Sequence, residues 1–149
     1  MIDEAEQAAI GWAVTQLVYR ATALTDAGAW EKLADLYLED GVLARPSAPD
    51  QPIVGRTAIL AASRARPPRT SRHVVSNPVV TIVSADEARV TSTLLLFTGP
   101  VGDGVVTADG TIMIGSFDDH VRRVDGQWKF ARRTGTMAMQ YRPDVPSGA

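Results

Sequence analysis

The sequence contains no cysteine, which excludes disulfide bonds, thiolate nucleophiles and thiolate metal ligands. It has no block of the ~18 apolar residues that a membrane-spanning helix needs. Its acidic, polar first residues lack the basic start and apolar core of a secretion signal. Basic residues are not in excess, since the formal net charge is −2, and this argues against a nucleic-acid partner. We therefore expect a cytoplasmic protein with no nucleic-acid and no membrane partner.

The motifs of cofactor and metal proteins are missing as well. No phosphate-binding glycine loop, dinucleotide fingerprint or serine-nucleophile elbow occurs. The glycines and aspartates of residues 99–110 do not match the spacing of a calcium loop. In "FDDH" (117–120) neighbouring strand residues face opposite ways, so we expect these side chains to be exposed rather than to chelate one ion. We therefore expect no metal and no cofactor.

What is present is the pattern of one α+β domain spanning residues 1–149. Apolar residues make up 45% of the chain and charged residues 21%, which is ordinary for a globular protein. Apolar residues at helical spacing predict helices over residues 3–24, 29–38 and 55–66. Segments rich in Val, Ile, Thr and Phe, with tight-turn signals between some of them, predict strands over residues 72–83, 88–98, 111–124 and 127–141.

Helices followed by antiparallel strands favour helices packed on one face of a curved, mostly antiparallel sheet. Residues 39–52 are typical of a turn, a short strand and a proline-punctuated loop, and residues 99–110 of a mobile loop. We expect the tail, residues 143–149, to be disordered. This architecture can leave a cavity between helices and sheet, and that is where we expect a functional site.

One of only two histidines, His73, lies in the strand-like run "TSRHVVSNPVV" (70–80). An imidazole with an unperturbed pKa of ~6.5 can act as a base near neutral pH. A carboxylate that binds one ring nitrogen fixes the tautomer and stabilises the cation, and Asp26 in "LTDAGAW" is a candidate for this role. Two alternatives stay open: Asp26 caps the second helix, or His73 is a satisfied strand residue without a chemical role.

Several arginines lie on or near the last hairpin, and we expect most of them to be solvated. Because Arg132 and Arg133 are adjacent in a strand, one of the two must face inward. An inward arginine needs an anion, such as a substrate oxygen or a leaving group. The alternation of side chains along the strand does not by itself say which of the two arginines faces inward.

Aromatic residues and methionines are candidates for the walls of a pocket, although ordinary core packing is an alternative for each. The candidates are Trp12, Tyr19, Tyr37, Met113, Phe117 and Met137. By the period of two, Asn77 shares a face with His73, while Pro78 after it marks a bulge or an edge strand. Such a lining predicts a compact, mostly apolar cyclic or aromatic substrate with one or two oxygens.

The segments "ALTDAGAWEKLADLYLEDGVL", "VGRTAI", "SRHVVSNPVV" and "VDGQWKFARR", in this order, resemble the SnoaL-like branch of the nuclear transport factor-like superfamily. The resemblance covers residues 5–141 and implies a cone-shaped α+β domain with a deep central pocket. Within the branch the sequence is similar to the scytalone dehydratases and the γ-hexachlorocyclohexane dehydrochlorinases. Both groups use a histidine–aspartate dyad to abstract a proton.

The resemblance implies that His73 and Asp26 form this dyad and that Arg133 is the inward arginine. The chain also departs from the pattern. Ala21 stands where the dehydrochlorinases have a lysine, and Thr25 stands where the dehydratases have a tyrosine. These departures argue against either specific substrate while leaving the dyad in place.

We therefore expect a cofactor-independent lyase of the dehydratase or β-elimination type. His73 would remove a proton from carbon, Asp26 would orient His73, and Arg133 would stabilise developing negative charge. A polyketide cyclase or isomerase with the same base is an alternative. A non-catalytic small-ligand-binding domain, like the small subunits of dioxygenases, is another. Because relatives associate through the outer sheet face, we expect a homo-oligomer, with a trimer favoured over a dimer.

Overall fold

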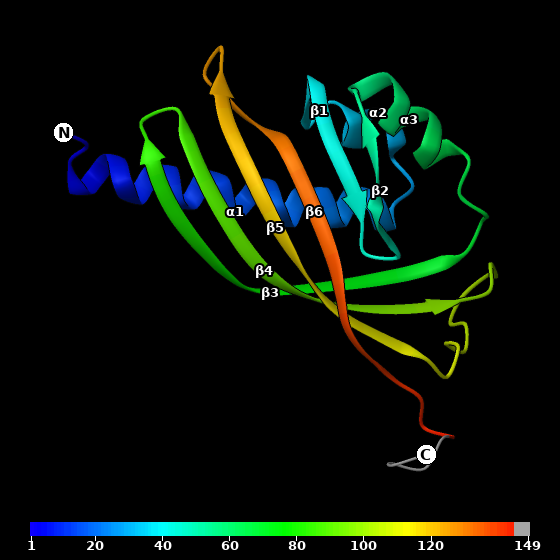
Figure 1. Cartoon of the computed structure of the whole chain (residues 1–149). Coiled ribbons are helices and arrows are strands. Elements are labelled where there is room, and N and C mark those ends of the chain that lie inside the picture. Colours follow the sequence, from blue (N-terminus) through cyan, green and yellow to red (C-terminus); the bar gives the residue numbers. More distant parts are fainter. Residues whose placement is uncertain (145–149) are drawn as a thin grey trace.

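The computed structural model describes residues 1–144, which form three helices and a six-stranded sheet (Figure 1). The helices are α1 (Glu4–Asp26), α2 (Trp30–Ala34) and α3 (Arg56–Arg64). The strands are β1 (Tyr37–Arg45), β2 (Ala48–Val54), β3 (Thr70–Ser84), β4 (Glu87–Gly99), β5 (Ile112–Val124) and β6 (Gln127–Tyr141). None of the described helices has the length and apolar character needed to cross a bilayer. Most of the tail that we expect to be disordered, residues 145–149, lies outside the described residues.

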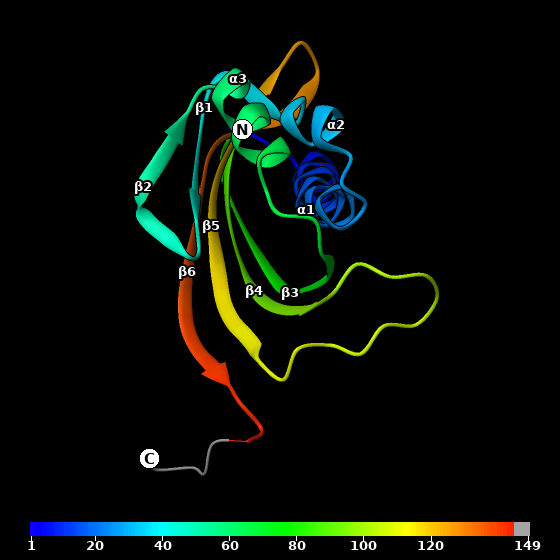
Figure 2. The same ribbon diagram turned by 90° about the vertical axis from the view of Figure 1, so that its right-hand side faces the viewer.

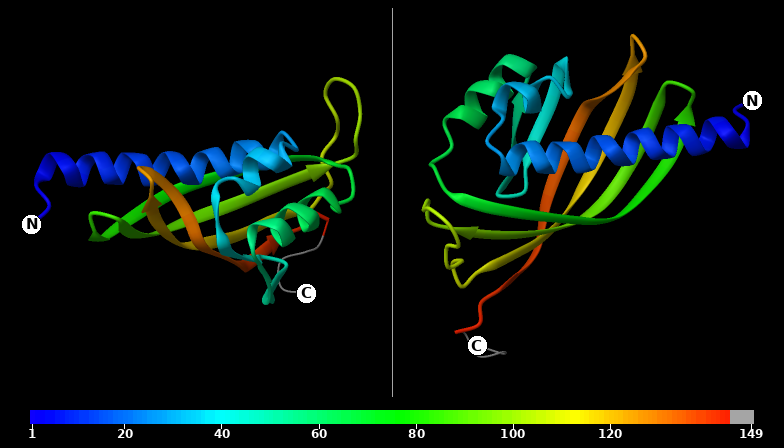
Figure 3. Two further views of the ribbon diagram at one scale, coloured as in Figure 1. Left: turned by 90° about the horizontal axis from the view of Figure 1, so that it is seen from above. Right: turned by 180° about the vertical axis from the view of Figure 1, so that it is seen from behind.

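The strands form one open sheet in the order β2-β1-β6-β5-β4-β3. All neighbouring strands are antiparallel except β1 and β6, which are parallel. The sheet bends strongly, and α1 lies along its concave side (Figure 2). Views from above and behind show α1 crossing the sheet while α2 and α3 stand near one end (Figure 3). The predicted α+β architecture, with helices on a curved and mostly antiparallel sheet, is confirmed.

The curvature has a local cause in β-bulges. In β3 the register with β4 shifts between Ser76 and Val79, and Asn77 adopts a φ of 53° there. Further shifts interrupt the pairing of β5 with β6 and of β1 with β6. Each bulge adds an unpaired residue that bends the strand and increases its twist. The long strands can therefore wrap around α1 instead of forming a flat sheet.

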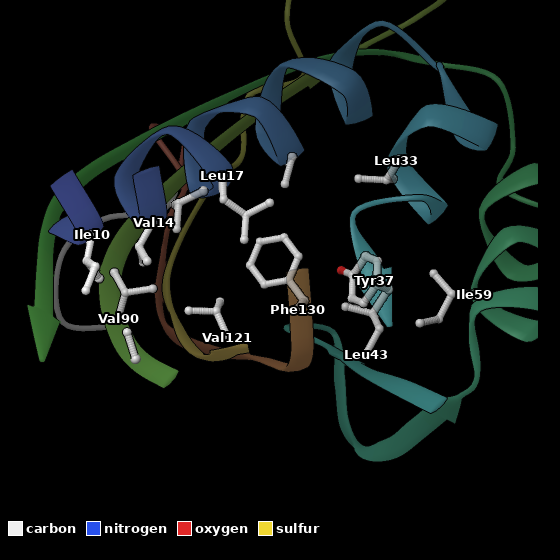
Figure 4. Close-up of a cluster of buried hydrophobic side chains, with 13 residues drawn as sticks. Ile10, Val14, Leu17, Leu33, Tyr37, Leu43, Ile59, Val90, Val121 and Phe130 are labelled. Carbon is white, nitrogen blue, oxygen red and sulfur yellow. The ribbon is translucent and has the colours of Figure 1, made fainter. Parts of the chain in front are cut away.

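A hydrophobic core joins α1 to the inner face of the sheet. The helix begins at the cap Asp3, whose Oδ1 accepts a hydrogen bond from the Glu6 N–H at 2.8 Å. Its apolar stripe faces strand residues at one end of the sheet (Figure 4). The buried residues of this layer include Ile10, Val14, Leu17, Val90, Val121 and Phe130. The core fills the space under the first two-thirds of α1, so any cavity must lie toward its carboxyl end.

The second helix is shorter than predicted. Residues 29–38 are expected to be helical, but α2 ends at Ala34. The backbone N–H of Phe130 donates to the Leu36 carbonyl at 2.8 Å, and Tyr37 then pairs with Phe130 as the first residue of β1. Pairing with β6 therefore overrides the helical pattern in this segment.

The loop expected before the third helix is also partly wrong, because residues 48–54 form β2. Two prolines, Pro49 and Pro52, lie in this strand. They are tolerated because β2 is an edge strand, where a missing N–H need not interrupt a ladder. The four long strands, in contrast, agree with their predicted ranges to within two residues.

Replacing Phe130 by alanine should strongly destabilise the fold. The side chain is fully buried, and its ring centroid lies 5.2 Å from that of Tyr37. We expect the free energy of unfolding to fall by about 3–5 kcal/mol, as for large buried aromatic residues. Urea unfolding measures this change. Val79→Ala, at a side chain that is 63% exposed, is the control and should change stability by no more than about 0.5 kcal/mol. Equal losses in the two variants would contradict the assigned core.

Candidate active site

The site is organised around the carboxylate of Asp26, the last residue of α1. The hydroxyl of Ser71 donates to Oδ1 at 3.0 Å, and the backbone N–H of His73 donates to Oδ2 at 2.8 Å. The cap position of α2 is Ala29, which makes no side-chain capping bond. Asp26 thus joins the end of α1 to the start of β3, and the alternative that it caps the second helix is wrong.

The imidazole of His73 contacts the same carboxylate. Its Nδ1 lies 2.5 Å from Asp26 Oδ1, and the two side chains are only 12% and 13% exposed. Because an ionised carboxylate only accepts hydrogen bonds, Nδ1 carries the proton and Nε2 is left with a free lone pair. Burial lowers the pKa of His73 below its usual 6.5, against the opposing effect of Asp26. The charges of Arg66 and Arg69 lower this pKa further. At neutral pH the ring is therefore an uncharged base.

A cavity of about 310 Å³ lies beside His73, between the carboxyl end of α1 and the inner face of the sheet. Six of the predicted site residues border it: Tyr37, His73, Met113, Phe117, Arg133 and Met137. At one corner the ring of Pro46 lies directly over Gly135, where an added Cβ would collide with it. The volume is at the lower end of the range for small-molecule sites.

Three predicted site residues lie elsewhere. Trp12 and Tyr19 are 68% and 39% exposed, because they fall on the face of α1 that points away from the sheet. Asn77 is exposed and does not border the cavity. The bulge between Ser76 and Val79 breaks the alternation that would otherwise place Asn77 on the face of His73.

The structure resolves which of the two adjacent arginines faces inward. Arg132 is exposed, whereas Arg133 is 4% exposed and borders the cavity. The guanidinium of Arg133 stacks on the ring of Phe117 at 3.8 Å from the centroid. Its Nε lies 3.2 Å from Oδ1 of Asp119. This ion pair holds a positive charge against the cavity wall.

The expectation that the "FDDH" segment is exposed is wrong for Asp119. Its side chain is fully buried, and Asp119 pairs across the sheet with Arg133. Burial raises the pKa of Asp119 to about 6, against the opposing charge of Arg133. The period of two could have revealed this position, since Phe117 and Val121 face inward in the same strand.

The same segment gives no support for a metal ion. His120 is half-buried, and its Nε2 lies 2.7 Å from Oε1 of Glu87, not from the neighbouring aspartates. Within residues 1–144, no three His, Asp or Glu side chains come close enough together to hold an ion.

Tyr37 brings a neutral hydrogen-bond donor to the cavity. The side chain is buried, and burial raises its pKa to about 12, although the nearby charge of Arg133 opposes the shift. The phenol therefore keeps its proton over the physiological range. A protonated hydroxyl beside a guanidinium is suited to binding a substrate oxygen.

Three further arginines, which sequence reasoning missed, also border the cavity. Arg45 ends β1, and Arg66 and Arg69 lie in the connection from α3 to β3. This connection, "RARPPRT", has no strand or helix period from which side-chain directions could be derived. The only signal for these arginines in the sequence is the high local density of arginine and proline.

The raised pKa of Asp119 predicts a pH dependence of stability. The folded protein binds a proton at this carboxyl up to about pH 6, whereas an unfolded aspartate titrates near its ordinary value of about 4. Between these values the folded state binds more protons, so the free energy of unfolding falls as pH rises. Relative to Asp119→Asn, the wild type should lose up to about 3 kcal/mol across this window. Urea unfolding of both proteins at several pH values tests this, and parallel pH curves would refute it.

Comparisons with known proteins agree with this architecture. A solved structure from Novosphingobium aromaticivorans, which carries the provisional name scytalone dehydratase, is 26% identical. Its TM-score is 0.80, and 99% of each chain is covered. The structure of a type 2 hexachlorocyclohexane dehydrochlorinase is 18% identical, with a TM-score of 0.80 and coverage of 99% of this chain and 100% of that one.

A third structure, an NTF2-like protein with a cystatin-like fold from N. aromaticivorans, is 21% identical. Its TM-score is 0.69, with coverage of 100% of this chain and 96% of that one. At 18% and 21% identity, the likeness shows the fold alone. No curated protein matches the chain. The model of the SnoaL-like domain family matches residues 6–134. Since this match spans most of the chain, including Asp26, His73 and Arg133, the protein belongs to the SnoaL-like family.

Proposed function

We propose that the protein is a cofactor-independent lyase that eliminates water or another small leaving group from a compact cyclic or aromatic substrate. The observation that carries this proposal is the 2.5 Å contact of His73 Nδ1 with Asp26 at the wall of a 310 Å³ cavity. The names of two similar structures, a dehydratase and a dehydrochlorinase, describe elimination reactions and support it. Family membership alone does not fix a reaction, because the reaction depends on the residues of the site.

In the proposed step, Nε2 of His73 removes a proton from a substrate carbon. The electrons of the broken C–H bond form a C=C double bond, and the leaving group departs with the electrons of its own bond. The imidazolium then returns the proton, which converts a departing hydroxide to water. Asp26 holds the ring in the reactive tautomer and stabilises the transient cation through the contact to Nδ1.

Two further residues at the cavity can stabilise the charge that develops on the substrate. Arg133 and the protonated hydroxyl of Tyr37 both border the cavity and can bind an oxygen that becomes negative. Met113, Phe117 and Met137 provide apolar surface that holds the carbon skeleton and excludes water. A base, groups that bind negative charge and an apolar surface at one cavity together suit an elimination.

Two alternative functions use the same cavity. A cyclase or isomerase would use the same base and would differ only in the fate of the carbanion, which product analysis distinguishes. A non-catalytic binding domain has no need for a buried imidazole hydrogen-bonded to a carboxylate. The short contact between Asp26 and His73 therefore favours an enzyme.

We also propose that the protein forms a homo-oligomer, with a trimer favoured over a dimer, through the outer face of the sheet. Cross-strand pairing aligns four apolar residues on this face: Val74, Leu95, Ile114 and Met139. The two at the ends of this row, Val74 and Met139, are 47% and 60% exposed. A contiguous apolar row on an open sheet is typical of a surface that is covered by another subunit.

Ring opening of 5-nitrobenzisoxazole tests the base. This planar carbon acid opens by elimination when a base removes its C–H proton, and the product is coloured. His73→Ala should lower kcat/KM by about 10²–10⁴-fold, the range for a general base. Arg132→Gln, at the exposed neighbour of Arg133, is the control and should leave the rate unchanged. A His73→Ala variant that folds and keeps the full rate would refute the proposed mechanism.

The pH profile of the same reaction gives an independent reading. The rate should rise with pH and level off below 6.5, because burial lowers the pKa of His73 and only the neutral ring accepts the proton. Asp26→Asn removes the charge that raises this pKa, so the plateau should begin at lower pH and at a reduced rate. A wild-type profile that still rises steeply above neutral pH would assign the base to another group.

Light scattering tests the oligomer. Val74→Glu places a charge in the exposed apolar row without disturbing a buried side chain. The variant should shift the molar mass from that of the oligomer to that of the monomer, since a charge at a subunit interface must be desolvated. Ala5→Glu, at an exposed position of α1 and away from the outer face of the sheet, is the control. A monomeric wild type would contradict the proposal directly.

A further inference from the structure

The cavity carries an excess of positive charge. Four arginines border it, namely Arg45, Arg66, Arg69 and Arg133, and among the described residues no aspartate or glutamate does. The two acids behind its walls are already engaged, since Asp26 contacts His73 and Asp119 pairs with Arg133. Three guanidinium groups therefore remain uncompensated around a cavity whose other lining residues are mostly apolar.

Two of these three arginines, Arg45 and Arg66, are partly buried and have no carboxylate partner among the described residues. Elsewhere in the described part of the chain, Arg64 pairs with Glu31, and Arg123 pairs with Asp86 at 2.8 Å. In residues 1–144 no carboxylate lies within ion-pair distance of Arg45, Arg66 or Arg69. Exposed arginines such as Arg89 and Arg132 also lack a carboxylate partner, but water solvates them, whereas Arg45 and Arg66 are partly buried beside a cavity in which an external anion can take that place.

Arg66 is the central member of this group. It is half-buried beside the ring of Trp30, and its Nε has no contact with solvent and no hydrogen-bond partner within residues 1–144. Burial lowers the pKa of Arg66, and the neighbouring charge of Arg45 lowers it further, while Tyr37 opposes the shift. A buried donor without a partner, held among like charges, costs stability unless a ligand satisfies it.

The chemistry of the group indicates what this ligand is. A guanidinium presents its N–H donors in a planar fork that matches the two oxygens of a carboxylate or the oxygens of a phosphate. Arg66 and Arg69 also border a second hollow of about 360 Å³ that shares His73 with the first. An oxyanion bound to these arginines would therefore lie beside the base.

We propose that the substrate is a small organic oxyanion whose acidic group binds Arg66, flanked by Arg45 and Arg69, while its carbon skeleton occupies the apolar cavity next to His73. This assignment rests on the proposed function of the same cavity and adds the charge of the substrate. The negative group anchors one end of the molecule, and Arg133 remains available for the charge that develops at the other end.

Calorimetric titration with benzoate, phenyl phosphate and benzamide tests the assignment. The first two are ring compounds with an oxyanion, and benzamide is the neutral counterpart of benzoate. We expect at least one anion to bind the wild type about tenfold or more tightly than benzamide, which corresponds to one strong charge-assisted contact. The comparison of benzoate with phenyl phosphate then tells which oxyanion the site prefers.

Arg66→Gln should remove this preference while leaving the affinity for benzamide unchanged. Arg132→Gln removes the same charge from the outer face and should behave as the wild type. Should Arg66→Gln fail to fold, Arg69→Gln, at an exposed side chain, replaces it and should weaken anion binding in the same direction. Equal binding of anions and benzamide, no binding of any of them, or equal affinities in the Arg66 and Arg132 variants would overturn the inference.

The titration also separates this inference from the proposed reaction. His73→Ala should keep the preference for the anion, because the imidazole is not part of the arginine group. If that variant retains full elimination activity, the mechanism fails while the anion site stands. If the wild type shows elimination that depends on His73 but no preference for anions, the mechanism stands and the anion site fails.

Discussion

The geometry of the site depends on the carboxylate of Asp26. Asp26 ends α1 and accepts hydrogen bonds from the Ser71 hydroxyl and from the backbone and ring of His73, so the same group that attaches the helix to β3 also sets the tautomer of the proposed base. Structure and chemistry are coupled here, since any movement of the helix end relative to β3 displaces the imidazole. The long α1 thus acts as a rigid support, with its core-packed portion fixing the position of its last residue.

The cavity exists because the curved sheet continues beyond the core that packs it against α1. Bulges bend the long strands, and the core side chains fill only the part of the concave face that lies under the first two-thirds of α1. Toward the end of the helix the sheet continues beyond the core, and the space between them is lined by small α1 residues such as Ala21 and Thr25. These are the positions where the sequence departs from the dehydrochlorinases and dehydratases that it resembles. The connection of α3 to β3 contributes positive charge to the cavity, because its residues Arg66 and Arg69 border it.

Much of the fold and of the candidate site could be predicted from the sequence, wherever its periodic patterns are long. The strand alternation of β6 limited the inward arginine to one of two residues, and the resemblance to the family pointed to Arg133. What failed has physical reasons: a bulge reversed the direction of Asn77, and strand pairing shortened the second helix. Trp12 and Tyr19 are pocket candidates by residue type alone, although the helical stripe already places them opposite the core. The arginines of the α3–β3 connection lie in a loop, where no period fixes side-chain direction.

The contact of Pro46 with Gly135 has a bearing on how the family could diversify. Because the proline ring occupies the space of a side chain at residue 135, β6 cannot narrow or reshape that corner by substitution. Pro46 and Ser47 also border the cavity, and they lie in the β1–β2 turn outside the strand pairing, so a change there need not repack the sheet. Selection for a new substrate would therefore act first on this turn, and a change there would reshape the cavity wall while leaving the proposed base and its supporting helix untouched.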